Sequence, residues 1–98
     1  MIEHVVIFKW AATATETQIN AALAALRTLK DRIPGVISLS VGNTITERGQ
    51  GFTTGLVVRM ESAETLAAYG PHPAHQEVLN NFIVPIKDNI IAIDYVVD

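Results

Sequence analysis

Cysteine is absent from this 98-residue chain. That absence excludes a disulfide framework, a thiolate nucleophile and a cysteine-based zinc site, and it leads us to expect a reducing, cytoplasmic location. Basic residues are scarce as well, since seven Lys plus Arg against ten Asp plus Glu give a formal net charge of −3. Without a basic stripe to neutralise phosphates, the chain is not expected to bind nucleic acid.

Long apolar runs and a basic leader are also missing. No stretch approaches the ~18 consecutive apolar residues of a membrane span, so we expect no membrane association. The opening segment, MIEHVVIFKW, carries Glu3 and His4 inside its apolar run and has no basic start, so we expect no signal peptide. Hydrophobic residues nevertheless make up 49% of the chain, which is ample for one globular domain spanning residues 1–98.

Strand-like and helix-like segments alternate along the chain. Four segments are rich in β-branched and aromatic side chains, which predicts strands at residues 2–10, 36–45, 52–61 and 90–97. After the first strand, Thr15 and Gln18 have the spacing of a capping box. Apolar residues then recur every three or four positions up to Pro34, which predicts one amphipathic helix.

A second helical region lies between the third and fourth strands. Ser62 is a suitable N-cap, Gly70-Pro71 interrupts the helix, and His72-Pro73 restarts it. The resulting order is βαββαβ. It predicts an α+β, ferredoxin-like fold, in which a four-stranded antiparallel sheet has two helices on one face.

The side of the sheet away from the helices is not polar, as it would be in a sheet wetted on that side. The alternating sets leave apolar residues on both sides, and such a patch is larger than soluble monomers usually expose. We therefore expect a homodimer, a dimeric α/β barrel, in which two sheets pack face to face. The expected interface residues are Val5, Ile7, Ile37, Leu39, Val57, Ile91, Ile93 and Tyr95, with Val41 beside them.

The segment YGPHPAHQEV holds two of the three histidines and one of the two tyrosines. If Pro73 is the first helical residue, His72 is the N-cap and His75 lies in the first turn. The positive end of the helix dipole then disfavours protonation of His75 and keeps a neutral imidazole available as a general base. Tyr69, just before the break, can turn its phenol toward the same space and donate a hydrogen bond.

These residues can border a small-ligand pocket between the helices and the sheet. Besides Tyr69 and His75, the predicted lining residues are His4, Val6, Phe8, Leu56, His72, Val78, Leu79, Ile90 and Ala92. Each polar residue also has a structural interpretation: His75 as part of a helix start, Tyr69 as a seal of the core edge, and His4 as a hydrogen-bonded core residue. Asp94 is expected to pair with a backbone N–H or with Lys9. No metal site is predicted, because the N-cap position of His72 would splay it from His75 and no carboxylate is an obvious third ligand.

Several segments together resemble the stress-responsive dimeric α/β-barrel (Dabb) family. They are HVVIFKW, IPGVISLSVGNTI, GFTTGLVVRMES, AAYGPHPAHQEV and IAIDYVV, which cover nearly the whole chain. The resemblance implies a ferredoxin-like fold and a homodimer joined through its sheets, but little about activity.

The HPAH segment is also similar to that of olivetolic acid cyclase, a member that closes a linear polyketide by aldol condensation without cofactor or metal. The resemblance implies that its catalytic tyrosine and histidine correspond to Tyr69 and His75, and that a pocket histidine corresponds to His4. A second pocket histidine falls on Thr54, and pocket aromatics fall on Leu26 and Ala22, so the pocket wall differs. Leu26 and Thr54 are therefore also expected to line the pocket.

Three functions are compatible with these patterns. The first is a homodimeric Dabb protein of unassigned biochemical role that binds a small apolar or aromatic molecule, with no cofactor. The alternative is a cofactor-independent polyketide cyclase or aldolase-type enzyme in which His75 is the base and Tyr69 the donor. The third is a structural, stress-protective dimer without a pocket.

Overall fold

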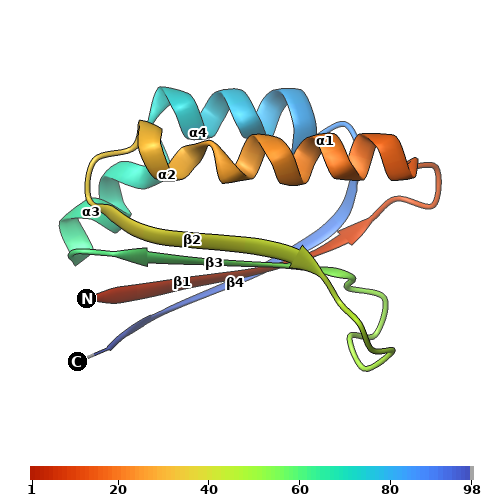
Figure 1. Cartoon of the computed structure of the whole chain (residues 1–98), viewed down its shortest axis with the longest axis horizontal. Coiled ribbons are helices and arrows are strands. Elements are labelled where there is room, and N and C mark those ends of the chain that lie inside the picture. Colours follow the sequence, from red (N-terminus) through yellow and green to blue (C-terminus); the bar gives the residue numbers. More distant parts are fainter. Residues whose placement is uncertain (98) are drawn as a thin grey trace.

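The computed structural model describes residues 1–97 and has the element order βαββαβ (Figure 1). Asp98, the last residue of the predicted domain, lies outside the described residues. The strands are β1 (Ile2–Trp10), β2 (Val36–Asn43), β3 (Thr54–Met60) and β4 (Lys87–Val96), and the helices are α1 (Glu16–Arg27), α2 (Leu29–Arg32), α3 (Ala63–Tyr69) and α4 (Pro73–Val78). Within residues 1–97, no helix combines the length and the apolar character needed to cross a membrane.

The four strands form one antiparallel sheet in the order β2-β3-β1-β4. The helices α1, α2 and α4 lie over one face of this sheet, while α3 lies near the end where the chain termini are found (Figure 1). The predicted ferredoxin-like fold is therefore confirmed.

The first helical segment begins as predicted but is not continuous. Thr15 and Gln18 form a capping box, in which the Gln18 N–H donates to Thr15 Oγ1 (3.1 Å) and the Thr15 N–H donates to Gln18 Oε1 (2.9 Å). The prediction of a single helix is wrong, because α1 ends at Arg27 and α2 begins at Leu29. At the break, the Thr28 hydroxyl donates to the Ala25 carbonyl oxygen (2.7 Å), a side-chain bond that competes with the helical backbone pattern.

Because of a bulge in β2, two residues lie on the opposite face of the sheet from the one predicted. Register with β3 shifts between Val36 and Ser38, so Leu39 lies opposite Val58 and Val41 opposite Leu56. Leu39 and Val41 therefore pack against the core under the helices, and the prediction that they lie on the dimer face is wrong. One extra residue in a strand reverses the alternation that follows it.

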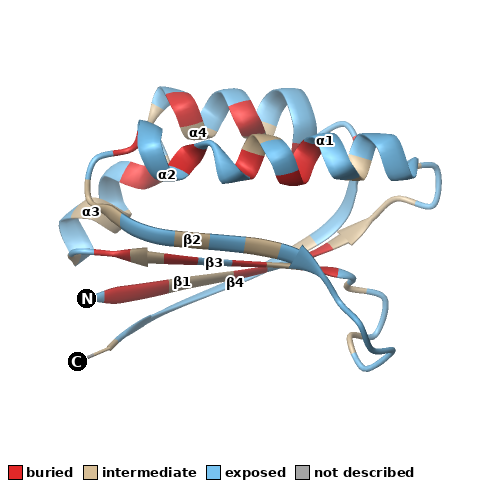
Figure 2. Ribbon diagram, in the orientation of Figure 1, coloured by how far each residue is buried: buried red, intermediate tan, exposed pale blue. Residues whose placement is uncertain are grey.

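The two faces of the sheet differ in exposure on the inner strands β1 and β3, whereas β4 is exposed along nearly its whole length (Figure 2). We call the face beneath the helices the covered face; its β1 and β3 residues Val6, Phe8, Leu56 and Val58 are buried in the core. We call the other the open face; there Ile93 is 59% exposed, Tyr95 48% and Ile91 46%. The predicted interface residues Ile7 and Val57 are also exposed and Val5 is half-buried, while Ile37 is exposed at the bulge.

One charge pair marks an end of the open face. Glu3 lies opposite Arg59 in the β1–β3 register, and the Arg59 Nε donates to Glu3 Oε1 over 2.7 Å. Glu3 is 7% exposed, and its other carboxylate oxygen is buried without a hydrogen-bond partner among the described residues. The middle of this face, where Val5, Ile7, Ile91 and Ile93 lie together, is apolar.

Candidate functional site

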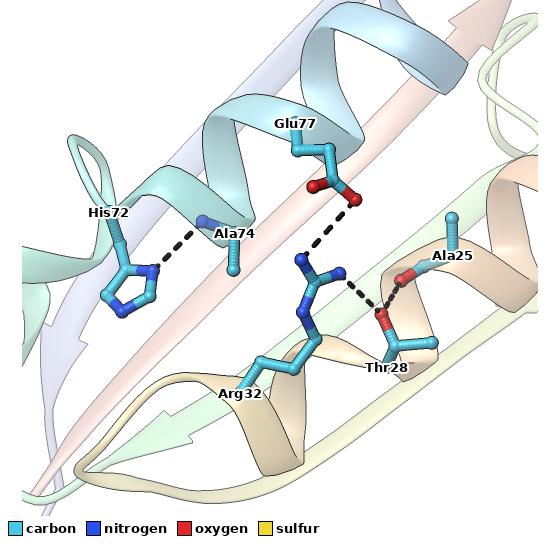
Figure 3. Close-up of polar contacts among 6 residues, drawn as sticks. All are labelled: Ala25, Thr28, Arg32, His72, Ala74 and Glu77. Carbon is cyan, nitrogen blue, oxygen red and sulfur yellow. Dashed lines mark hydrogen bonds and ion pairs between the residues drawn. The ribbon is translucent and has the colours of Figure 1, made fainter.

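The break between α3 and α4 positions the tyrosine and both histidines of the YGPHPAHQEV segment. Helix α3 ends at Tyr69, and Pro73 is the first residue of α4. His72 is the N-cap, as predicted, because its Nδ1 accepts a hydrogen bond from the Ala74 N–H over 3.0 Å (Figure 3). His75 is thereby placed in the first turn of the restarted helix.

An ion pair between helices holds this restarted helix in place. Arg32, at the end of α2, donates to Glu77 Oε1 on α4 over 3.4 Å, and its other terminal nitrogen donates to Thr28 Oγ1 over 3.4 Å (Figure 3). Both partners of the pair are partly exposed, so its contribution to stability is on the order of 1 kcal/mol or less. Its position still links α4 to the short helix on the same face of the sheet.

The backbone determines which nitrogen of His75 carries a proton. His75 Nδ1 lies 2.9 Å from the Gly70 carbonyl oxygen, which can only accept, so Nδ1 donates and Nε2 of the neutral ring keeps its lone pair. Burial lowers the pKa of the His75 imidazole, and His4 and His72 add to this, while the bond to Gly70 opposes it. The ring is therefore neutral near pH 7. The neutral state predicted from the helix dipole arises mainly from desolvation.

Tyr69 is buried and packs against the rings of His4 and His75. Its side chain is 2% exposed, and its ring centroid lies 4.4 Å from that of His75 and 5.5 Å from that of His4. Burial raises the pKa of the Tyr69 phenol to about 12, so the hydroxyl stays protonated and able to donate. Among the described residues, this hydroxyl has no hydrogen-bond partner, which is costly for a buried polar atom.

Asp94 adds a carboxylate to this polar group from the neighbouring strand. His4 on β1 and Asp94 on β4 face each other in register, and His4 Nδ1 lies 2.5 Å from Asp94 Oδ1. The predicted pairing of Asp94 with Lys9 is wrong, since Lys9 lies 3.8 Å from Asp88 instead. The carboxylate accepts from Nδ1 and fixes the orientation of the His4 ring.

A cavity of about 220 Å³ lies between the helices and the covered face. Every residue that lines it belongs to the set expected from the sequence: His4, Val6, Phe8, Leu26, Leu56, His75, Leu79, Ile90 and Ala92. Its wall is almost wholly apolar, with two imidazoles as the polar groups. An apolar cavity with a few convergent polar groups has the make-up of a small-molecule site.

Four expected site residues lie outside the cavity wall. Tyr69 is buried beside the histidines, His72 caps α4, and Val78 is packed in the core. Thr54 belongs to a different hydrogen-bond chain, in which it accepts from Trp10 Nε1 (2.8 Å) and donates to Asn43 Oδ1 (2.6 Å). The Trp10–Thr54 contact was not anticipated, although the register that creates it follows from the alternation of β1 and β3.

Two larger hollows occur elsewhere on the molecule. One, of about 630 Å³, lies between the open face and the β2–β3 loop, and the other, of about 320 Å³, lies beside Trp10 and the start of α1. Neither is lined by a histidine, and both are wider and more polar than the 220 Å³ cavity. The smaller cavity is the stronger site because a neutral base borders an apolar enclosure there.

The fold and the site define a ferredoxin-like domain with a cavity under its helices and an apolar open face. The chain belongs to the Stress responsive A/B Barrel Domain family, which it matches over residues 2–97. It is 37% identical over 100 residues to a stress-response A/B barrel domain-containing protein of Arabidopsis thaliana. The alignment includes the whole of this chain but only 37% of that relative's length.

Two solved structures illustrate the fold. A dimeric ferredoxin-like protein of unknown function from Thermobifida fusca has a TM-score of 0.87 at 24% identity, covering 98% of this chain and 90% of that one. A hydroxynitrile lyase from Passiflora edulis has a TM-score of 0.87 at 19% identity, covering 99% of this chain and 93% of that one. At these identities the likeness concerns the fold alone.

Proposed function

We propose that this domain binds a small apolar or aromatic molecule in the cavity between its helices and the covered face. The supporting observation is the union of an apolar wall with two imidazoles at one end, one of which has a free Nε2 lone pair. A purely structural dimer would fill this space with side chains, because voids in protein cores are destabilising. The cavity therefore favours binding over the structural interpretation.

We further propose that the domain works as a homodimer joined through its open faces. Support comes from the exposed Ile91, Ile93 and Tyr95 on that face, and from the Thermobifida fusca neighbour, which is described as dimeric. A contiguous apolar patch of this kind is unusual on a soluble monomer. A second copy offers the same patch, so the contact is self-complementary.

A second candidate function is cofactor-independent proton transfer of the cyclase or aldolase type. The specific observation is the neutral His75, whose ring packs on that of Tyr69, and a Tyr69 hydroxyl that is buried with no hydrogen-bond partner among the described residues. His75 Nε2 would remove a C–H proton next to a carbonyl, and the resulting enolate would attack a second carbonyl carbon to form a C–C bond. Tyr69, which lies outside the cavity wall, would have to turn its hydroxyl into the cavity to donate a hydrogen bond to the enolate oxygen, and the proton would return from His75 to the new alkoxide.

An enzyme is not foreign to this fold, since the Passiflora edulis neighbour is a hydroxynitrile lyase. For this chain the distinguishing experiment is mutational. His75→Ala is expected to abolish any turnover while leaving the melting temperature and dimerisation almost unchanged. Asn80→Ala, at an exposed position just after α4, is the control and should keep full turnover. Turnover retained in His75→Ala would contradict the cyclase candidate.

Binding itself is tested by native mass spectrometry of the purified protein. We expect an adduct carried through purification, and we expect its loss when the cavity is filled by the substitution Ala92→Phe. Ala24→Phe, on an exposed position of α1 outside the cavity, should retain the adduct. An adduct that survives Ala92→Phe would place the ligand elsewhere and contradict the proposed site.

A further inference from the structure

The residues of β1 and β4 form the floor of the 220 Å³ cavity, and they change from polar at one end to apolar at the other. On β1 the lining residues are His4, Val6 and Phe8, and the β4 residues directly opposite them are Asp94, Ala92 and Ile90. The polar pair at one end is followed by Val6 and the small Ala92, and the far end is filled by Phe8 and Ile90. Free space therefore lies over the middle of the floor, beside the imidazoles.

The length of this space follows from strand geometry. Four steps along the strand lead from His4 to Phe8, which corresponds to about 13 Å of backbone, and the side chains at the two ends occupy part of that distance. A cavity of about 150 Å³ is large enough to hold benzene. The 220 Å³ available here therefore accepts one six-membered ring with a few further heavy atoms. It is smaller than the ~300–1,000 Å³ of pockets for drug-sized ligands.

The far wall of the cavity is held in place. Phe8 is 2% exposed and stacks on Trp10, with ring centroids 5.2 Å apart and the planes 6° from parallel. The indole is anchored in turn, because Trp10 Nε1 donates to Thr54 Oγ1 over 2.8 Å. Phe8 cannot move aside without breaking this stack, so the cavity does not lengthen beyond Phe8 at this end.

The imidazole of His75 at the polar end of the cavity determines which functional group of a ligand can bind there. His75 Nε2 accepts a hydrogen bond at the cavity wall, and the Tyr69 ring, whose centroid lies 4.4 Å from that of His75, packs against the imidazole from outside the wall. A hydroxyl group is both a donor and an acceptor, so an aromatic hydroxyl satisfies His75 directly and leaves its oxygen available to a neighbouring donor. The opposite edge of such a ring would contact Phe8, Leu56 and Ile90.

We propose that the ligand is a single-ring aromatic hydroxyl compound, bound with its oxygen at His75 and its ring against Phe8, and that Phe8 sets the upper limit on its size. This proposal rests on the proposed binding function and narrows it to a substrate class. The ring is already formed when it enters, since a long linear chain does not fit between His75 and Phe8. The size limit therefore favours binding of a preformed ring over cyclisation of a linear polyketide.

Two matched probes test the proposal: 4-methylphenol, and 6-methyl-2-naphthol, which has the same substituents on two fused rings. Binding to the full chain is followed by NMR titration of the His75 ring nitrogens and by calorimetry. We expect wild-type protein to bind 4-methylphenol at least tenfold more tightly than the naphthol. Phe8→Ala should reverse this order. Ile90→Ala, a half-buried position across from Phe8, should do the same if Phe8→Ala does not fold.

Two further variants provide the controls. Ala92→Leu fills the middle of the floor and should abolish binding of both probes, while Ala24→Leu on the exposed side of α1 should change neither. Equal or tighter binding of the naphthol to wild-type protein, with His75 perturbed, would overturn the size limit and leave the binding function standing. If neither probe binds to wild-type protein or to either enlarged variant, the proposed binding function itself fails.

Discussion

The covered and open faces of the sheet are made by the same four strands, and both are apolar, yet they serve different contacts. The covered face lies beneath a hollow that is lined by His4 and His75, and Tyr69 packs against both rings from outside its wall. The open face presents exposed Ile91 and Ile93 in its middle, with charged groups at both ends of β1, where Glu3 pairs with Arg59 and Lys9 with Asp88. One face has polar groups beside a hollow, and the other has an exposed apolar centre.

This difference fits the two proposed roles of the sheet. Helices cover one side incompletely, and the hollow between them and the sheet is the proposed ligand site. No helix covers the other side among the described residues (Figure 1), and its exposed apolar residues form the proposed contact with a second copy. A substitution on one face should therefore impair its own proposed contact and leave that of the other face unchanged.

The largest effect is expected from a charge on the open face. Ile93→Lys should weaken dimerisation by more than about a hundredfold, because a buried, unpaired charge costs roughly 3 kcal/mol or more. Val84→Lys is the control, since Val84 is similarly exposed (52%) but lies outside the sheet. Sedimentation velocity at micromolar concentration measures both. An Ile93→Lys variant that remains dimeric would place the interface elsewhere.

Two neighbouring valines on β3 allow the energetic contributions of the covered and open faces to be compared directly. Val58 is fully buried on the covered face, and Val57, beside it, is 40% exposed on the open face. Val58→Ala should reduce the free energy of unfolding by about 2 kcal/mol, from lost burial and the cavity left behind.

Val57→Ala should cost less than this, and its cost should grow with protein concentration as dimers form. Chemical denaturation at several protein concentrations distinguishes the two valines. Equal costs with no concentration dependence would mean that no second copy covers Val57.

A substitution in the His4–Asp94 pair is expected to reduce ligand binding at the covered face without unfolding the protein. Asp94 is partly exposed, so Asp94→Asn should change the free energy of unfolding by about 1 kcal/mol or less. The His4 ring loses its charged acceptor, so ligand affinity should fall several-fold while dimerisation is unchanged. Calorimetry with 4-methylphenol and sedimentation velocity provide the readouts. Unchanged affinity would show that His4 does not take part in binding.

The smallest effect is a pH dependence that arises at His75. Its pKa in the folded state is lowered by burial, so the unfolded chain, with a value of about 6.5, binds a proton first as the pH falls. The His75 contribution is therefore absent above about pH 6.5 and destabilises the fold progressively below it. His75→Gln should flatten the fall in melting temperature between pH 7 and pH 5. An unchanged slope in that variant would contradict the burial of His75.

Most of the fold was predictable because it depends on alternation and caps, which are local in sequence. The Thr15 and His72 caps and the order of strands and helices along the chain follow from such patterns. The errors arose where a single residue changed the geometry. The bulge before Ser38 moved Leu39 to the covered face, and the Thr28 hydroxyl interrupted the first helix. Neither effect has a periodic signal in the sequence.

The site was predictable in its lining and less so in its polar contacts. Residues two apart on β1 share a face, so His4, Val6 and Phe8 could be grouped without a structure. The partner of Asp94 could not, because it depends on the register between the first and last strands. The choice of Gly70 as the acceptor for His75 depends on the backbone path through the helix break, which Gly and Pro indicate but do not specify.

The most direct measurement is the protonation state of His75, read from the ring nitrogens in long-range ¹⁵N–¹H NMR spectra at pH 7. The account predicts a neutral imidazole with its proton on Nδ1 and a bare Nε2, and a shift of the Nε2 signal when 4-methylphenol is added. A charged ring, or a proton on Nε2, would leave no acceptor at the polar end of the cavity. Either result would contradict the site on the covered face.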